Sequence, residues 1–211
     1  MAKYKIKEIH YTIQGEGYHA GRAAIFCRFS GCNLWSGREE DRHKAICRFC
    51  DTDFWGTDGH LGGAYNLSDL VDQIASLWPS ASQDHRFIVF TGGEPALQLD
   101  EDLIDLLHHS GFQIAIETNG TLDLPRGIDW ICMSPKANTD IVVTQGQELK
   151  IVYPQQGIDP EDFKDMYFEH FFLQPMDNER QDQNLAVVLH YCKSHPKWKV
   201  SLQTHKLMGI P

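Results

Sequence analysis

The stretch Arg86-Phe-Ile-Val-Phe-Thr-Gly-Gly-Glu-Pro95 decides the fold class of this chain. It begins as a short run of apolar and β-branched residues, which is typical of a buried strand, and it ends in a glycine-rich polar turn. Pro95 stands where a helix can begin, since proline is favoured at the first helical position. A strand, a polar turn and then a helix form the repeating unit of a parallel α/β fold.

Similar units recur along the chain on both sides of this stretch. We predict strands over Tyr4–Ile13, Ala23–Phe29, Arg86–Phe90, Phe112–Glu117, Trp130–Met133, Leu149–Val152, His170–Leu173 and Lys199–Leu202. We predict helices over three segments: one capped by Ser68 that ends before Pro79, one from Asp100 to a stop at Gly111, and one over Asn184–Lys193. This alternation predicts an α/β fold, an incomplete TIM-like βα barrel of about six parallel strands. We expect one domain over residues 1–211.

Five of the predicted strands end in a polar or glycine-rich cluster. The clusters are Thr91-Gly92-Gly93-Glu94-Pro95, Glu117-Thr118-Asn119-Gly120, Ser134-Pro135-Lys136, Gln174-Pro175-Met176-Asp177 and Gln203-Thr204-His205. Any one of them alone is an ordinary turn. Because the carboxyl ends of parallel strands converge on one mouth, we expect the five clusters to form a single site.

Composition narrows the class of protein. Of the 211 residues, 42% are hydrophobic, which suffices for one buried core. The formal net charge of −10 disfavours a duplex nucleic-acid binder, which needs a basic face. The opening Met1–Lys7 has no apolar segment typical of a signal peptide, and no stretch is long enough to cross a membrane. We therefore expect a cytoplasmic protein without a nucleic-acid or membrane partner.

Three cysteines indicate a metal centre. Cys32, Cys47 and Cys50 have the spacing C-x14-C-x2-C. The C-x2-C pair lets two thiolates grip one centre from a tight turn. Two interpretations remain open: a [4Fe–4S] cluster with one iron free of protein ligands, or a zinc site that His43 completes.

The loop from Cys32 to Cys50, with Phe49 before the last cysteine, resembles that of the radical S-adenosylmethionine superfamily, although the usual spacing there is C-x3-C-x2-C. The longer first gap is one of several features that together resemble the 7-carboxy-7-deazaguanine synthase family. The others are Tyr11-Thr12-Ile13-Gln14-Gly15-Glu16-Gly17, Cys50-Asp51-Thr52 and Thr91-Gly92-Gly93-Glu94-Pro95. The resemblance covers nearly the whole chain, through Ser134-Pro135-Lys136 and Gln174-Pro175-Met176-Asp177 to Pro211.

The resemblance implies a lyase of 7-deazapurine and queuosine biosynthesis, a tRNA modification pathway. The implied reaction converts 6-carboxy-5,6,7,8-tetrahydropterin to 7-carboxy-7-deazaguanine with loss of ammonia. The implied cofactors are a [4Fe–4S] cluster, S-adenosylmethionine and Mg²⁺. The pterin and a one-electron donor are the expected partners, and the chain is expected to form a homodimer.

The same resemblance assigns roles to individual residues. The cluster ligands are Cys32, Cys47 and Cys50. The residues implied to bind S-adenosylmethionine are Phe49, Asp51, Gly92, Gly93, Glu94, Ser134, Pro135, Lys136, Gln174 and Asp177. Those implied to bind substrate are Ile13, Gln14, Gly15, Glu16, Arg28, Thr91, Glu117, Asn119 and the carboxylate of Pro211. Thr52 is the implied Mg²⁺ ligand. We take residues 30–53 as the cluster-binding loop and expect the C-terminal tail to reach the substrate site.

Physical chemistry bears on two of these roles, those of Arg28 and Thr52, and leaves an alternative for each. Arg28 alternates with Cys27 on a predicted strand, so the two side chains face opposite ways, and a guanidinium can hold a carboxylate bidentately. The alternative is that Arg28 forms an ion pair at the surface or at an interface. A lone hydroxyl such as that of Thr52 binds Mg²⁺ poorly, and an ordinary turn role is the alternative. Two other functions are considered: an activase that generates a glycyl radical on a partner protein, and a zinc-stabilised binding module without catalysis.

Overall fold

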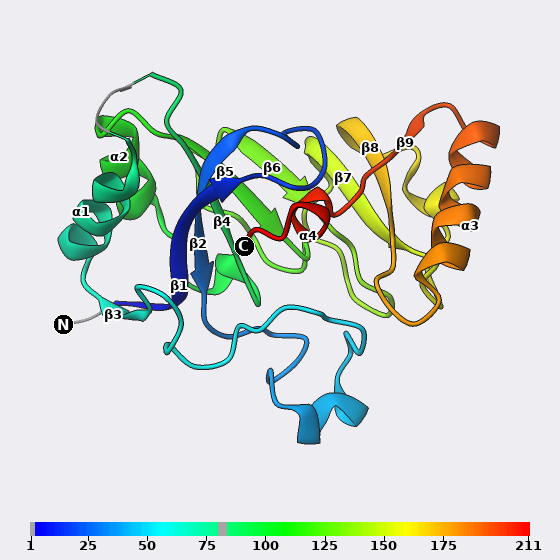
Figure 1. Cartoon of the computed structure of the whole chain (residues 1–211), viewed down its shortest axis with the longest axis horizontal. Coiled ribbons are helices and arrows are strands. Elements are labelled where there is room, and N and C mark those ends of the chain that lie inside the picture. The colour runs from blue at the N-terminus through cyan, green and yellow to red at the C-terminus, as the bar shows by residue number, and fades with distance from the viewer. Residues whose placement is uncertain (1–2, 80–83) are drawn as a thin grey trace.

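The computed structural model describes residues 3–79 and 84–211, so Met1 and Ala2 of the opening stretch lie outside it. Within these residues one nine-stranded sheet has the order β3-β1-β2-β4-β5-β6-β7-β8-β9. The strands are β1 (Tyr4–Ile13), β2 (Ala23–Phe29), β3 (Gly63–Tyr65), β4 (Phe87–Gly92), β5 (Gln113–Thr118), β6 (Trp130–Met133), β7 (Gln145–Tyr153), β8 (Tyr167–Pro175) and β9 (Trp198–Val200). The sheet is open, with β3 and β9 as its edges (Figure 1).

Parallel pairing dominates the sheet. β2 and every strand from β4 to β9 run parallel, which confirms the expected α/β class and an open, barrel-like run of strands. β1 is the exception to this parallel pairing, because it pairs antiparallel with both β2 and β3. The short connection 14–22 returns the chain directly alongside β1, whereas a parallel neighbour needs a longer crossover.

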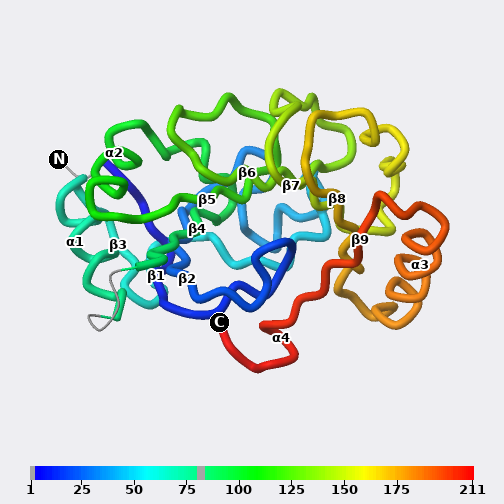
Figure 2. Tube along the Cα trace, turned by 90° about the horizontal axis from the view of Figure 1, so that it is seen from above, coloured from blue at the N-terminus to red at the C-terminus, as the bar shows by residue number. Residues whose placement is uncertain are grey.

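Four α-helices are present in the described residues: α1 (Leu67–Leu77), α2 (Glu101–His109), α3 (Gln181–Ser194) and α4 (Thr204–Met208). Short 3-10 helices are η1 (Glu39–Lys44), η2 (Pro95–Leu97) and η3 (Pro160–Phe163). In Figures 1 and 2, α1 and α2 lie at one end of the sheet and α3 at the other. No helix in residues 3–79 or 84–211 is both long and apolar enough to cross a membrane.

Two apolar clusters join the sheet to these helices. The first packs Ile25, Ile88 and Ile114 of the sheet against α1 and α2, and the second packs Leu149 and Leu173 against α3. Leu124 contacts both clusters from the helix-free loop between β5 and β6. That loop therefore takes the place of a crossover helix in the middle of the sheet, where strand–helix alternation would predict one.

The helix starts show how local chemistry sets the boundaries. Asp100 caps α2 as predicted, and its carboxylate accepts from the backbone N–H of Leu103 at 3.1 Å. The cap of α1 is Asn66, whose side chain accepts from the N–H of Asp69 at 2.9 Å, so the choice of Ser68 is wrong by two positions. Asparagine caps helices as well as serine does, and the hydroxyl of Ser68 instead donates to Asn66.

The turn after β2 packs directly on the turn after β4. The N–H of Glu94 donates to the carbonyl of Gly31 at 2.9 Å. A Cβ on Gly93 would lie 2.1 Å from that carbonyl oxygen and 2.7 Å from the Cβ of Cys32. Since backbone atoms cannot yield as a flexible side chain can, residue 93 must lack a side chain for Cys32 to sit where it does.

We therefore expect Gly93→Ala to destabilise the protein by about 2–3 kcal/mol, the cost of overpacking a tight contact. The midpoint of urea unfolding, followed by tryptophan fluorescence, measures the effect. Gly63→Ala is the matched control because its Cβ would meet only the Tyr65 side chain, at 3.4 Å. Equal midpoints for the two variants would contradict the steric argument.

Candidate active site

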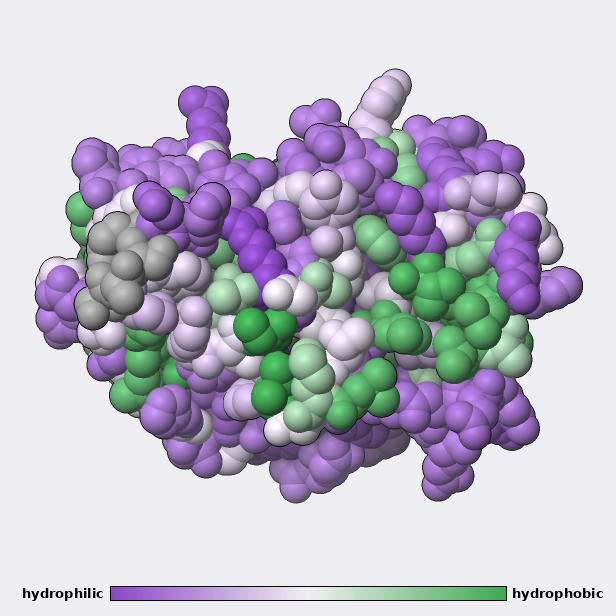
Figure 3. Space-filling model, turned by 45° about the horizontal axis from the view of Figure 1, so that its top comes forward, coloured by the Kyte–Doolittle hydropathy of each residue, from purple (hydrophilic) through white to green (hydrophobic). Residues whose placement is uncertain are grey.

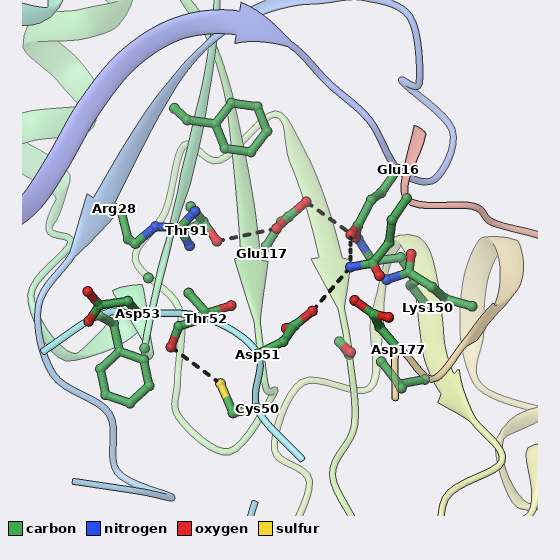
Figure 4. Close-up of a pocket in the computed structure, with 18 of the residues that line it drawn as sticks. Glu16, Arg28, Cys50, Asp51, Thr52, Asp53, Thr91, Glu117, Lys150 and Asp177 are labelled. Carbon is green, nitrogen blue, oxygen red and sulfur yellow. Dashed lines mark hydrogen bonds and ion pairs between the residues drawn. The ribbon is translucent and has the colours of Figure 1, made fainter. Parts of the chain in front are cut away.

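A cavity of about 390 Å³ lies at the carboxyl ends of the strands. All five polar clusters contribute to its lining, which confirms that they form one site. From these clusters the lining residues are Thr91, Gly92, Gly93, Glu117, Thr118, Asn119, Ser134, Lys136, Gln174, Pro175, Met176, Asp177, Gln203 and His205. Figure 4 shows several of them, with Thr91 and Glu117 on neighbouring strands.

The three cysteines of the C-x14-C-x2-C pattern line this same cavity. Cys32 follows β2, while Cys47 and Cys50 lie on the loop after η1. Trp35 and Phe54 form a small apolar cluster beside them. Three sulfurs from a segment of 19 residues, positions 32 to 50, therefore line the same cavity. Apolar side chains pack behind them.

Local hydrogen bonds shape the acidity of these thiols. The thiol of Cys47 donates to Cys50, which lowers the pKa of Cys50 to about 6 and raises that of Cys47. Burial raises the pKa of Cys32, although the N–H of Leu34 donates to its sulfur at 3.4 Å. One thiol of the three is thus prepared to ionise near neutral pH, and a soft metal centre would favour the thiolate form of all three.

The donor set fits an iron–sulfur cluster. Among the described residues, no group of three or more His, Cys, Asp or Glu side chains is arranged to hold a metal ion. A cubane takes one thiolate per iron, so its cysteines need not converge on one ion. His43 lies exposed on η1 and does not line the cavity. The zinc interpretation therefore lacks its fourth ligand in this structure.

The opposite side of the cavity is built on a buried lysine. Lys150 of β7 lies 2.6 Å from Glu16 and 3.5 Å from Glu117, and its side chain is only 6% exposed (Figure 4). Burial by itself lowers the pKa of Lys150, but Glu117 and Glu16 outweigh it and raise that pKa well above its usual value. Lys150 therefore carries a positive charge between two carboxylates.

Neighbouring polar side chains fix Glu117. Gln14 donates to one of its carboxylate oxygens and Thr91 to the other, each at 3.3 Å. The structure brings together four of the residues implied to bind substrate: Gln14, Glu16, Thr91 and Glu117. They present donors and acceptors on one wall, as recognition of a flat heterocycle requires.

Arg28 reaches the cavity as the strand alternation predicted, while Cys27 is buried on the other face of β2. The Nε–H of Arg28 donates to Glu8 at 2.8 Å. In residues 3–79 and 84–211 no partner is found for its two terminal nitrogens. A guanidinium held in this way offers a planar pair of donors to a carboxylate.

The C-terminus also lies at the cavity, and Pro211 lines it. The hydroxyl of Thr12 donates to the terminal residue at 3.1 Å, and Thr204 donates twice to the carbonyl of Gly15. A Cβ on Gly15 would collide with His205, so this glycine permits the close approach of the tail.

The remaining predicted site residues fall into two groups. Those that also line the cavity are Ile13, Gly15, Phe49, Asp51 and Thr52. Glu94 and Pro135 are buried and do not line it. Both oxygens of Glu94 are occupied: it accepts from Thr118 at 2.8 Å and from the N–H of Asn119 at 2.7 Å. In this structure Glu94 ties the end of β4 to the end of β5.

Several residues line the cavity although the sequence did not predict them as site residues. The clearest are Lys7, Lys150 and Lys206. A signal for Lys150 exists, because a lysine inside the apolar run Leu149–Val152 requires a buried counter-charge. Lys206 lies in a short helix whose pattern gives no such signal.

Comparisons with known proteins place the chain in a family. No family model matches it. It is 58% identical over 209 residues to the 7-carboxy-7-deazaguanine synthase of Burkholderia multivorans, with 99% of both chains covered. It is 57% identical over 208 residues to the protein of that name from Bradyrhizobium diazoefficiens, covering 98% of this chain and 99% of the relative. Its fold is similar to the crystal structure of QueE from Escherichia coli, with a TM-score of 0.71 and 26% identity, over 95% of this chain and 93% of that one. The 57–58% identity to the two relatives extends over nearly the whole chain. The chain therefore belongs to the 7-carboxy-7-deazaguanine synthase family.

Proposed function

We propose that this chain converts 6-carboxy-5,6,7,8-tetrahydropterin to 7-carboxy-7-deazaguanine with loss of ammonia, as a lyase of queuosine biosynthesis. The observation that carries the proposal is that one cavity joins a wall of three thiols to a wall of paired charges and amides. Its volume of about 390 Å³ suits small molecules. Membership of the family gives the reaction its name.

On the thiol wall, Cys32, Cys47 and Cys50 would hold a [4Fe–4S] cluster through their three thiolates. The cluster, when bound, would supply one-electron reduction of S-adenosylmethionine, the chemistry that starts hydrogen abstraction from the substrate. The protein binds and orients both reactants and excludes water. The residues proposed to contact S-adenosylmethionine from the cavity wall are Phe49, Asp51, Gly92, Gly93, Ser134, Lys136, Gln174 and Asp177.

Across the cavity, the terminal nitrogens of Arg28 bind the substrate carboxylate. Glu16 and Glu117 accept from the amino and ring N–H groups of the pterin, and Lys150 lies between the two carboxylates and orients them. The carboxylate of Pro211 completes the acceptor set. Each of these assignments uses a group that the fold already orients.

Mg²⁺ is proposed at Thr52, between the two walls. One hydroxyl is a weak site, because Mg²⁺ prefers six oxygens in octahedral geometry. The neighbouring carboxylate of Asp53 is already paired with Lys7 at 2.8 Å. The other ligands would then be substrate oxygens and water, so Mg²⁺ would bind well only when substrate is present.

We also propose that residues 1–211 form one radical S-adenosylmethionine core domain, with residues 30–53 as its cluster loop, and that the chain acts as a homodimer. Apolar side chains gather in patches on one face of the molecule (Figure 3). Tyr18, Leu207 and Met208 are each at least half exposed. Exposed apolar surface of this kind favours association. An unidentified one-electron donor is a further proposed partner.

The alternative functions receive less support. A glycyl-radical activase needs a docking face for a protein and no pterin pocket, whereas the charged wall here is enclosed in a cavity. A zinc-stabilised module needs a fourth ligand, and His43 is exposed and does not line the cavity that the three thiols line. The relatives favour neither function.

Anaerobic reconstitution tests the function. We expect about four irons and four sulfides per chain, and formation of 7-carboxy-7-deazaguanine from the carboxylated tetrahydropterin. Cys47→Ala should abolish the brown colour and the cleavage of S-adenosylmethionine, since two thiolates do not retain the cubane. Cys192→Ala, on α3, is the control and should retain both. Activity in the Cys47 variant would remove that residue from the ligand set.

Thr52→Ala should leave the iron content intact and raise the Mg²⁺ concentration needed for half-maximal turnover about tenfold or more, as loss of a metal-supporting group does. Thr52→Ser retains the hydroxyl and should remain close to the parent protein. An unchanged Mg²⁺ response in the alanine variant would return Thr52 to an ordinary turn role.

A C-terminal extension tests the role of the Pro211 carboxylate. One glycine added after Pro211 moves the charge by a residue, and we expect kcat/KM for the pterin to fall on the order of tenfold or more, because misplaced binding groups are costly. Iron content and the unfolding midpoint serve as controls and should not change. Full activity in the extended chain would exclude this carboxylate from the substrate site.

A further inference from the structure

The short helix α4 contacts segments that are far apart in the sequence. It lies beside the loop that joins β1 to β2 (Figures 1 and 2), where the N–H of Thr204 donates to the carbonyl of Gly15 at 2.9 Å. The turns on either side of the cavity mouth, after Cys50 and after β8, also reach this helix through side chains. α4 is therefore placed to connect parts of the site that the sheet alone does not join.

Lys206 joins two of these parts through a single ammonium group. Its Nζ lies 2.7 Å from a carboxylate oxygen of Asp51 and 2.5 Å from one of Asp177. Asp51 follows the last cluster cysteine directly, and Asp177 follows the end of β8. Without the lysine, two carboxylates would face each other across the mouth in a chain of net charge −10.

Gln203 extends this connection to the charged wall. Its Nε2 donates to Glu16 at 3.0 Å and approaches Asp51 at 3.4 Å. Its carbonyl oxygen accepts from Lys206 at 3.0 Å. Glu16 is the carboxylate that Lys150 holds, so a continuous chain of polar contacts runs from the buried lysine to the residue beside Cys50.

We propose that Gln203 and Lys206 form a clasp of positioning residues that holds Asp51, and with it the cluster loop, against the substrate wall. The inference rests on the proposed function in one respect: the clasp makes substrate and S-adenosylmethionine bind cooperatively. A ligand that orders Glu16 also orders Gln203, which contacts Glu16, and then Asp51, which contacts Gln203. By thermodynamic linkage, a ligand that orders Asp51 must favour binding at Glu16 to the same extent. Since Lys206, Asp51 and Asp177 are each partly exposed, the clasp adds little to global stability and acts on loop order instead.

Hydrogen–deuterium exchange of the reconstituted holoenzyme, without substrate or S-adenosylmethionine, tests the positioning role. In Lys206→Met we expect exchange to quicken by about fivefold or more in peptides spanning residues 46–53, while peptides from β4 and β5 stay unchanged. Lys164→Met is the matched control, because it breaks an exposed lysine–carboxylate pair on η3, away from the cavity. Lys206→Arg should restore slow exchange. Unchanged exchange in Lys206→Met, or equal quickening in the control, overturns the clasp.

Binding measurements test the cooperativity. The dissociation constant of S-adenosylmethionine is measured by equilibrium dialysis with and without the carboxylated tetrahydropterin. We expect the pterin to tighten binding about fivefold or more in the parent protein and by less than about twofold in Lys206→Met. Equal tightening in both proteins overturns the coupling.

Gln203→Met provides a second variant should Lys206→Met fail to fold, and it is expected to lose the same coupling. If the parent protein neither binds nor converts the pterin, the proposed function fails. The exchange experiment still decides whether the clasp positions the loop, because it uses neither ligand.

Discussion

Cys32 can reach the cavity because two backbone turns touch without a side chain between them. The carbonyl of Gly31 accepts from the N–H of Glu94, and a Cβ at Gly93 would lie 2.1 Å from it. This contact fixes the start of the cysteine-containing loop, residues 30–53, to the end of β4. Glu94 then ties the same turn to β5 through Thr118 and Asn119. The positions of the first thiol and of two neighbouring strand ends thus depend on one close approach of main chain to main chain.

Charge balance is the second constraint on the site. The chain is acidic overall, yet the cavity is organised around cations: Arg28, Lys136, Lys150 and Lys206 all line it. Lys150 sits between two carboxylates, and Lys206 sits between two more. Truncating one partner of the buried Lys150 set leaves an uncompensated charge, whereas the Lys206 set is partly exposed and is screened by solvent. The site is therefore polar on one wall and thiol-rich on the other, and Lys150 and Lys206 each stand between two carboxylates.

Much of the sheet followed from local pattern. The bounds of β1, β2 and β6 agree with the predicted strands, and Asp100 caps α2, because short apolar runs and helix caps are decided by neighbouring residues. The failures are equally physical. β3 is a three-residue edge strand that pairs only with β1, and it lies outside all the predicted strands. The helix-free link between β5 and β6 places Leu124 against both apolar clusters of the core, which no periodicity reveals.

The sequence by itself determined the cysteine spacing, the strand-end clusters and the family, since each is carried by residue type in a fixed order. It also determined that Arg28 and Cys27 face opposite ways, because strand side chains alternate. Only the tertiary structure decided that the buried Glu94 links the end of β4 to the end of β5. It also decided that Lys150 pairs with Glu16 and Glu117. It alone decided that Lys206 of α4 meets Asp51, 155 residues away in the sequence. The physical reason is distance: a hydrogen bond or ion pair acts over a few ångströms, and chain folding alone determines which distant residues come that close.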